Sequence, residues 1–207
     1  LNTISFYMRV LRAVYNRAVD ENIMEQKSPF KHVYTGIDRT IKRAISAKEI
    51  KAIKEYDFSS NPPLELARDL FMFSFYTRGM SFVDMAYLKK SNLKNGILTY
   101  RRKKTGQQLF IKWEECMQEI IDKYSNNTGH LLPIIKESDT DERMQYLNSL
   151  SYTNKKLKKI AALVGLPIPL TMYVARHSWA SIAKRNNIPI SVISEGMGHD
   201  NEKTTRI

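Results

Sequence analysis

The sequence has little of several features that mark particular classes of protein. It contains one cysteine, Cys116, in 207 residues, so an internal disulfide or a thiolate metal cluster is excluded and a reduced, cytoplasmic protein is expected. No apolar run approaches the roughly 20 residues that a membrane-spanning helix requires, and the first ten residues lack the layout of a signal peptide. Glycine-rich phosphate loops and metal-ligand spacings are absent from the sequence too, so no metal or other cofactor is expected.

Acidic residues are too few to balance the basic ones. The chain has 33 Lys and Arg against 21 Asp and Glu, which gives a formal net charge of +12 and an isoelectric point near 9.7. Such a charge favours a polyanionic partner, with nucleic acid first. An anionic membrane surface is the weaker alternative, because no long helix of the sequence has a clean basic face opposite an aromatic one.

The hydrophobic pattern predicts a mainly helical chain in two parts. Residues 5–22 have an amphipathic helical pattern ended by the turn at 28–30, and a lone helix cannot bury its apolar stripe, so it is expected to belong to a helical domain. Residues 31–45 have little periodicity and many basic residues, which is typical of a linker, either merely solvated or lying along a DNA backbone. A capping-box pattern at 46–49 begins a second domain. Its further helices are predicted at 64–76, 114–124, 148–164 and 172–185, with a short one from Ile188 and an acidic patch at 137–142.

Residues 96–113 carry the best strand pattern of the chain. Two β-rich runs flank Lys103-Lys104-Thr105-Gly106, a composition that suits a hairpin turn. The predicted fold class is therefore mainly α with a small antiparallel β-sheet. The lysine pair is either a solvated turn or a functional feature.

The predicted helix 172–185 places four side chains on one face. Tyr173, Arg176, His177 and Ala180 follow the spacing i, i+3, i+4 and i+7. A phenol, a guanidinium and an imidazole together would suit an oxyanion such as a phosphate. The alternative is a buried Tyr and His beside a solvated Arg.

The sequence Arg-His-Ser-Trp-Ala at 176–180, followed by Met-Gly-His at 197–199 and Thr-Thr-Arg-Ile at 204–207, resembles the catalytic domain of tyrosine recombinases, the phage-integrase family. That family has a His-x-x-Arg-His pattern, a hydrophobic-Gly-His box, and a nucleophilic Tyr nine residues after the box histidine. Counting nine residues from His199 gives position 208, so the resemblance implies that this 207-residue chain binds DNA without cleaving it. It also implies three segments: a remnant of a core-binding domain at 1–30, a linker at 31–45, and a catalytic domain at 46–207 that stops just before the nucleophile.

The resemblance implies site-specific recombination or integration through a 3′-phosphotyrosine intermediate, for a mobile element and without metal or ATP. Arg78 and Arg176 would stabilise the charge on the attacked phosphate, since forked guanidinium donors suit its oxygens. Lys104 would protonate the departing 5′-hydroxyl, with Lys103 as the second choice, and His199 would hydrogen-bond a phosphate oxygen.

Two positions depart from the family pattern. The family's first arginine lies in the pattern Gly-Leu-Arg-x-Ser-Glu-Leu. If Asp84 is aligned with the acid of this pattern, Ser81 falls on the arginine; if Arg78 is aligned with the arginine, Ser81 falls where the family prefers an acid. Were this turn helical, Arg78 and Ser81 would share a face, so Arg78 is the candidate in both alignments. Tyr173 stands where many relatives have His; a phenol can donate to a phosphate but is no base at neutral pH.

Double-stranded DNA is the partner that charge and resemblance both imply, with no membrane contact. A homo-tetramer on DNA is expected of the full-length protein, and a monomer of this chain alone. The competing functions are a non-catalytic DNA-binding regulator and a type IB topoisomerase-like relaxing enzyme. The residues expected on the DNA backbone are Lys42, Arg43, Arg101, Lys103, Lys155 and Lys156, a solvated helix face being the alternative for the last two.

Overall fold

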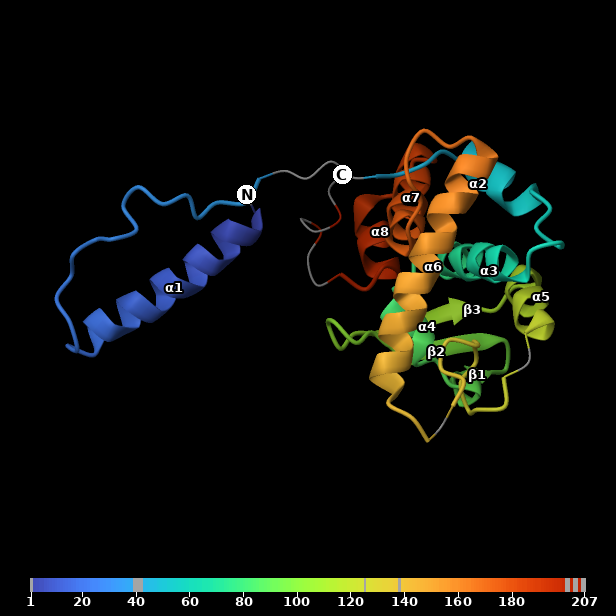
Figure 1. The fold of residues 1–207 in the computed structure, drawn as a ribbon, viewed down its shortest axis with the longest axis horizontal. Helices are drawn as coiled ribbons and strands as arrows, with labels where there is room; N and C mark the ends of the chain where they lie inside the picture. Colours follow the sequence, from blue (N-terminus) through green and yellow to red (C-terminus); the bar gives the residue numbers. More distant parts are fainter. Residues whose placement is uncertain are drawn as a thin grey trace. The chain divides into compact units, whose positions relative to one another are not determined.

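The computed structural model describes residues 2–38, 43–124, 126–137 and 139–199, together with residues 202 and 205. The chain divides into two compact units, Leu1–Ile41 and Lys42–Ile207, both drawn in Figure 1. Among the described residues, no helix is at once long and apolar enough to cross a membrane.

The first unit is one long helix, α1 (Asn2–Asp20), with an irregular segment folded back along it. The Tyr15 hydroxyl joins the two, donating to the Glu25 carbonyl at 3.2 Å and accepting from the Lys27 N–H at 2.6 Å. The helix ends before the predicted turn at 28–30, because Asn22 adopts a positive φ of 56° and the N–H groups of residues 21–23 bond back to its last turn.

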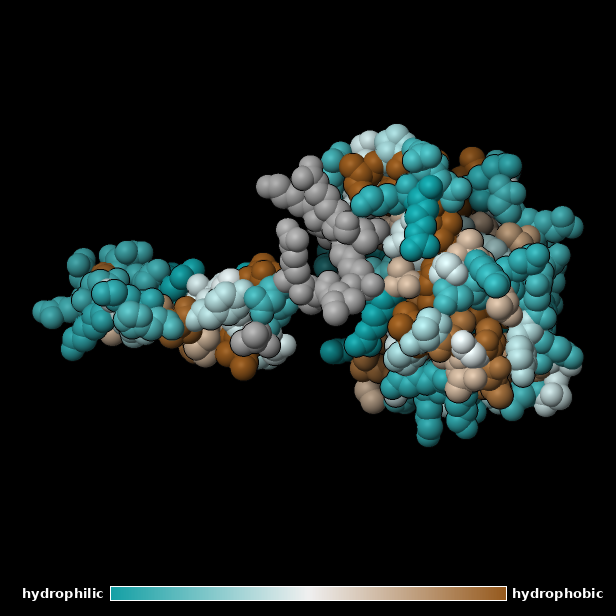
Figure 2. All heavy atoms as spheres, turned by 90° about the horizontal axis from the view of Figure 1, so that it is seen from above, coloured by the Kyte–Doolittle hydropathy of each residue, from teal (hydrophilic) through white to brown (hydrophobic). Residues whose placement is uncertain are grey.

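The apolar stripe of α1 stays largely exposed. In Figure 2 the spheres of this unit alternate between hydrophilic teal and hydrophobic brown. Ser5 is the one buried residue that the structure describes in this helix. The exposed large apolar side chains of α1 are Ile4, Phe6, Tyr7, Val10, Leu11 and Val14.

The second unit is built around α3 (Pro62–Tyr76), which contacts α2, α5, α6 and α7 and lies in the middle of the unit in Figure 1. This position explains why the α3 sequence is apolar on most sides, with Phe71 and Phe73 fully buried. The surrounding helices are α2 (Ala47–Glu55), α4 (Phe82–Ala86), α5 (Glu115–Lys123), α6 (Glu142–Val164), α7 (Met172–Arg185), α8 (Ile190–Gly196) and the 3₁₀ turn η1 (Lys90–Asn92).

Helix ends follow local capping chemistry, which the sequence predicted at one site and not at another. The capping box of α2 is present, with the Ser46 and Glu49 side chains each bonded to the other's backbone N–H. The predicted start of α6 at residue 148 was wrong. The helix begins at Glu142 because the Asp141 side chain accepts the N–H groups of Arg143 and Met144.

The predicted hairpin is confirmed and belongs to a three-stranded antiparallel sheet with the order β1-β2-β3. The strands are β1 (Leu93–Lys94), β2 (Ile97–Arg101) and β3 (Gln108–Lys112), and β1 escaped prediction because two residues carry no alternation. The β2–β3 register pairs Leu98 with Ile111 and Tyr100 with Leu109, and all four are buried. Alternate residues of these strands therefore face the core. A residue that directly follows a strand continues this alternation, so its side-chain direction is set as well.

Candidate active site

Four segments distant in the sequence meet at Arg176, in the first half of α7. They are the α3–α4 turn, the β2–β3 turn, α7 itself, and the segment after α8. Gly79 makes the first approach possible: its φ is +73°, and a Cβ at this position would lie 2.6 Å from the Arg176 Cα. Only a residue without a side chain fits, so Gly79 fixes the distance between the α3–α4 turn and α7.

Arg176 is a buried cation, with 5% of its surface exposed. Nη1 donates to the Gly79 carbonyl at 2.7 Å, and Nη2 donates to the Met197 carbonyl at 2.6 Å. Burial, reinforced by the charge of Arg102, lowers the pKa of Arg176 to about 10, so it stays protonated at neutral pH. Within the described ranges no carboxylate forms an ion pair with it. A buried charge held by neutral hydrogen-bond partners, without a carboxylate, favours an anion from outside the protein.

His199 extends the arrangement from Arg176. Its Nε2 lies 2.8 Å from Arg176 Nη2, and its Nδ1 lies 2.6 Å from the Thr205 hydroxyl. A guanidinium only donates, so Nε2 accepts and the proton of a neutral imidazole lies on Nδ1, which donates to Thr205. The predicted tight turn at Gly198 is present, with φ +65°; a Cβ there would lie 2.9 Å from Leu109 Cδ1 and 3.2 Å from Arg102 Cδ.

Arg102 is a further buried arginine, which our sequence interpretation did not single out. It is 7% exposed, and its Nη1 donates to the Gly198 carbonyl at 2.5 Å. Its Nε is buried and has no hydrogen-bond partner among the described residues. The signal was present in the sequence, because Leu98, Tyr100 and Arg102 alternate and the first two face the core.

Arg78 lies at the α3–α4 turn with its side chain against α8. A Cβ added at Gly196 would lie 3.5 Å from Arg78 Cδ and 3.9 Å from its Nη1. The turn from Arg78 to Ser81 is not helical: Arg78 has φ +59°, and Ser81 is the N-cap of α4. The two residues are therefore not stacked on one helix face.

Tyr100 shows that three arginines share one neighbourhood. Burial raises the pKa of its hydroxyl well above the usual value, and Asp84 acts in the same direction. Arg176, Arg102 and Arg78 act in the opposite direction, so all three guanidinium groups lie within electrostatic range of one phenol.

Lys103 and Lys104 at the β2–β3 turn have different surroundings. The Lys103 N–H donates to Asp84 Oδ1 at 2.9 Å, and its ammonium lies 3.0 Å from the centroid of the Tyr87 ring. Both lysines are exposed, and Lys104 forms no hydrogen bond, ion pair or cation–π contact with another described residue. The turn itself reaches the site, because the Thr105 hydroxyl donates to the Gly198 carbonyl at 3.3 Å.

Tyr173 lies at the rim, 64% exposed, with its ring 4.4 Å from the His177 ring in an edge-to-face arrangement. The predicted face of α7 therefore divides: Arg176 and Ala180 are buried, His177 is half-buried, and Tyr173 is open to solvent. The alternative of a buried Tyr beside a solvated Arg was wrong.

The other predicted DNA-binding residues are spread over the second unit. Arg101 is exposed and donates to the Gly106 carbonyl at 2.7 Å, and Arg43 is exposed before α2. Lys155 and Lys156 lie on α6, where the Lys156 ammonium is 4.9 Å from the Tyr152 ring. Lys42 lies outside the described residues.

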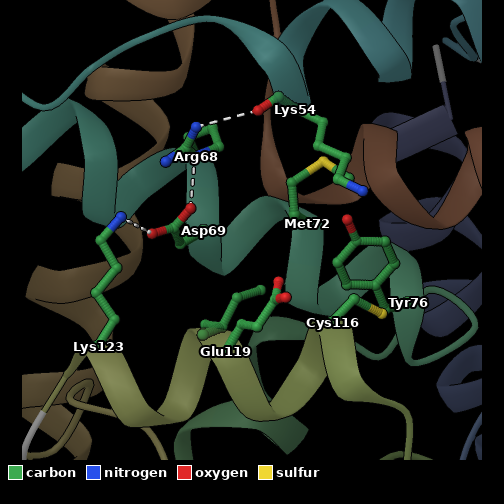
Figure 3. A pocket seen from close by; sticks show the side chains of 9 residues that line it. Lys54, Arg68, Asp69, Met72, Tyr76, Cys116, Glu119 and Lys123 are labelled. Carbon is green, nitrogen blue, oxygen red and sulfur yellow. Dashed lines mark hydrogen bonds and ion pairs between the residues drawn. The ribbon is translucent and has the colours of Figure 1, made fainter.

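A separate cavity of about 180 Å³ lies among α2, α3 and α5 (Figure 3). The Asp69 carboxylate at this cavity is satisfied within the protein: it accepts from Arg68 at 2.5 Å, from Lys123 at 3.1 Å and from the Tyr124 hydroxyl at 2.6 Å. Nowhere in the described part of the chain do three or more His, Cys, Asp or Glu gather as metal ligands.

The fold and the arginine cluster define the class of protein. The Phage integrase family model matches residues 43–207, and the chain belongs to this family. It is 22% identical over 172 residues to the tyrosine recombinase XerC of Rickettsia bellii (strain OSU 85-389), covering 81% of this chain and 55% of the relative. The chain thus spans about half the length of that relative.

Solved structures share the fold at low sequence identity. The Tn1549 transposon integrase in complex with a circular intermediate DNA has a TM-score of 0.72 and 15% identity, covering 99% of this chain and 74% of that one. XerH in a post-cleavage complex has a TM-score of 0.71 and 16% identity, covering 98% and 62%. A lambda integrase tetramer bound to a Holliday junction has a TM-score of 0.66 and 17% identity, covering 95% and 57%.

Proposed function

We propose that this chain is the DNA-handling part of a site-specific tyrosine recombinase, which cuts and rejoins DNA for a mobile element. The observation that carries the proposal is the buried guanidinium of Arg176, held by carbonyls at 2.6 and 2.7 Å and not neutralised by a carboxylate of the described residues. Family membership supports it, as does the net charge of +12. A DNA phosphate supplies the anion that this site lacks.

The phosphate is proposed to bind among the arginines. Arg176 and Arg102 are held by backbone carbonyls, and Arg78 lies in the same neighbourhood. Donors that need no rearrangement stabilise the extra charge that develops on the phosphate oxygens during attack. Tyr173 at the rim can donate a further hydrogen bond through its hydroxyl.

The chemical step follows the family pattern. The phenol oxygen of a tyrosine at position 208 attacks phosphorus and releases its proton to solvent. The bond from phosphorus to the 5′ oxygen breaks, and the 3′ phosphate becomes joined to the tyrosine. Lys104 gives its proton to the departing 5′ oxygen. The covalent intermediate preserves the bond energy until a 5′-hydroxyl attacks in reverse and rejoins the strand.

The geometry of His199 refines its proposed role. Without DNA its Nε2 accepts a hydrogen bond from Arg176, and a phosphate oxygen also only accepts. His199 can therefore donate to a phosphate through Nε2 only after this nitrogen gains a proton. We propose that Thr205 holds the ring through Nδ1 while this happens.

The proposed domain organisation follows the same family pattern. Residues 1–30 are assigned to a core-binding domain, 31–45 to a linker and 46–207 to the catalytic domain. The full-length protein is proposed to act as a homo-tetramer on two duplexes, by analogy with the lambda integrase tetramer on a Holliday junction. The polypeptide of residues 1–207 is proposed to bind DNA without cutting it.

Covalent capture tests the proposal. The chain carrying a tyrosine at position 208 is incubated in EDTA with nicked duplexes of random sequence, and adducts are separated on denaturing gels and sequenced. We expect a protein–DNA adduct that residues 1–207 alone, or a phenylalanine at 208, do not form. DNA retention without any adduct would favour the regulator, and relaxation of plasmid lacking a partner site would favour the topoisomerase.

A further inference from the structure

The two lysines of the β2–β3 turn differ in how they are held. The last residue before α4, Ser81, donates its hydroxyl to Asp84 Oδ2 at 2.6 Å, and the other Asp84 oxygen accepts the Lys103 N–H at 2.9 Å. The Lys103 ammonium lies over the Tyr87 ring at 3.0 Å, well within the range of a cation–π contact. Lys103 is thus held at both its backbone and its side chain.

Tyr87 provides a fixed surface for this contact. Its ring packs edge-on against His130, with centroids 6.5 Å apart, and lies 6.4 Å from the Tyr146 ring of α6. Burial raises the pKa of its hydroxyl, so the phenol stays neutral well above pH 7. The ring that meets Lys103 is therefore positioned by two other elements of the fold.

Holding Lys103 restricts its neighbour. Consecutive Cα atoms are about 3.8 Å apart, so the direction of residue 104 depends on how residue 103 is oriented. On the other side, the Thr105 hydroxyl bonds the Gly198 carbonyl at 3.3 Å. Lys104 lies between two anchored residues, while its own side chain is exposed.

We propose that Tyr87 is a positioning residue: by holding the Lys103 ammonium, it orients the β2–β3 turn so that Lys104 reaches the departing 5′ oxygen. This inference rests on the proposed function, in which Lys104 is the proton donor. It also assigns different tasks to the two lysines, with Lys103 as the anchor and Lys104 as the acid.

The test compares two leaving groups on one DNA. The probe is a nicked duplex recovered by the covalent capture described above, made once with its natural 5′ oxygen and once with sulfur at that bridging position. A thiolate leaves without a proton, because a thiol is far more acidic than an alcohol, so sulfur removes the need for Lys104. The variants, each with a tyrosine at 208, are Tyr87→Leu, Lys103→Met, their combination, Tyr87→Phe and Lys104→Ala.

We expect Tyr87→Leu and Lys103→Met each to slow adduct formation about tenfold on the oxygen substrate, and the double variant to be no slower than either. Tyr87→Phe keeps the ring and should match the unaltered chain. On the sulfur substrate all of these variants should react at the same rate as the unaltered chain. Thermal unfolding checks that each variant is folded.

Two outcomes separate the possible failures. If Lys104→Ala is slow on oxygen and normal on sulfur, but Tyr87→Leu is equally slow on both, Lys104 is the acid and Tyr87 does not position it. If Lys104→Ala is as fast as the unaltered chain on oxygen, the proton-donor assignment fails and the role of Tyr87 fails with it. The proposal would also be overturned if the double variant lost the sum of the two single effects. The Tyr87 and Lys103 side chains would then act independently and not through their mutual contact.

Discussion

Arg68 and Arg176 are both largely buried arginines of the second unit, and they are held in opposite ways. Arg68 in α3 donates to the Asp69 carboxylate at 2.5 Å and lies 3.5 Å from Glu65. Arg176 in α7 donates to two backbone carbonyls and an imidazole, with no carboxylate partner among the described residues. One charge is neutralised by carboxylates inside the protein, and the other is the one that we propose to bind a phosphate.

This difference separates a structural charge from a functional one. An internal ion pair satisfies both partners and fixes two helices, here α3 and α5 through Asp69 and Lys123. A buried cation without a counter-ion destabilises the free protein, and a bound anion would offset this cost. Variants at the two arginines should therefore affect different measurements.

Arg176→Gln should give the largest loss of activity. Glutamine keeps N–H donors for the carbonyls of Gly79 and Met197 but removes the charge and the fork. In the chain with a tyrosine at 208, the rate of adduct formation should fall by about 10²–10³, the usual cost of one oxyanion donor. DNA retention in a filter-binding assay should change little. Equal loss of retention and adduct would make Arg176 a simple binding residue.

Arg102→Gln tests whether a second buried arginine without a carboxylate partner also acts in the reaction. We expect adduct formation to slow about tenfold to a hundredfold, because one of three cationic donors is lost while two remain. The neighbouring Arg101→Gln is the comparison, since that side chain is exposed on the opposite face of β2 and is predicted to contact only the DNA backbone, outside the phosphate site. Equal rates for the two variants would remove Arg102 from the proposed phosphate site.

Gly79→Ala tests the contact that places the turn against Arg176. The control is Gly165→Ala, which has nearly the same φ, +74° against +73°, but nothing within 4 Å of its Cβ position. The control should lose about 1 kcal/mol of unfolding free energy from backbone strain alone and keep its activity. Gly79→Ala should lose more stability and most of its adduct formation. Indistinguishable variants would show that the approach of Gly79 to Arg176 does not matter.

Asp69→Asn is the reverse case. It removes the negative charge that Arg68 and Lys123 both contact. We expect the free energy of unfolding in urea to fall by about 2 kcal/mol, which is less than for a fully buried ion pair because Lys123 is partly exposed. Adduct formation per folded molecule should be unchanged. If Asp69→Asn formed adducts more slowly while its free energy of unfolding was unchanged, the Arg68 ion pair could not be assigned a structural role separate from that of Arg176.

The sequence predicted most of the fold, because local chemistry decided it. The apolar pattern placed α3 and α7, the Ser46 capping box started α2, and the turn composition placed the hairpin. The misses have physical causes as well. The start of α6 depends on the single cap of Asp141, and β1 has two residues and no alternation to detect.

The candidate site was predictable only in part. Arg176 and His199 lie together as the motif order implies, at 2.8 Å. Arg102 was missed because it follows β2 and resembles a turn cation, and its burial depends on the pairing of Tyr100 with Leu109 and on contact with Gly198. Arg78 was the candidate from the motif, but its positive φ and the close approach of Gly79 to Arg176 depend on tertiary packing, which no local pattern contains.

The smallest expected effect concerns the lysines of α6, which neither arginine site includes. Lys155 is exposed, and Lys156 lies 4.9 Å from the Tyr152 ring. Both positions are compatible with a solvated helix face that does not contact DNA. If each lysine contacts a phosphate, replacing it by glutamine should reduce the slope of log affinity against log salt by about 1. Unchanged slopes for both variants would assign this face to solvent, and the electrostatic attraction for DNA would then come from the arginine cluster and the β2–β3 turn. A smaller slope for the Lys155 variant alone would show that Lys156 does not contact a phosphate, because its ammonium is held by the Tyr152 ring.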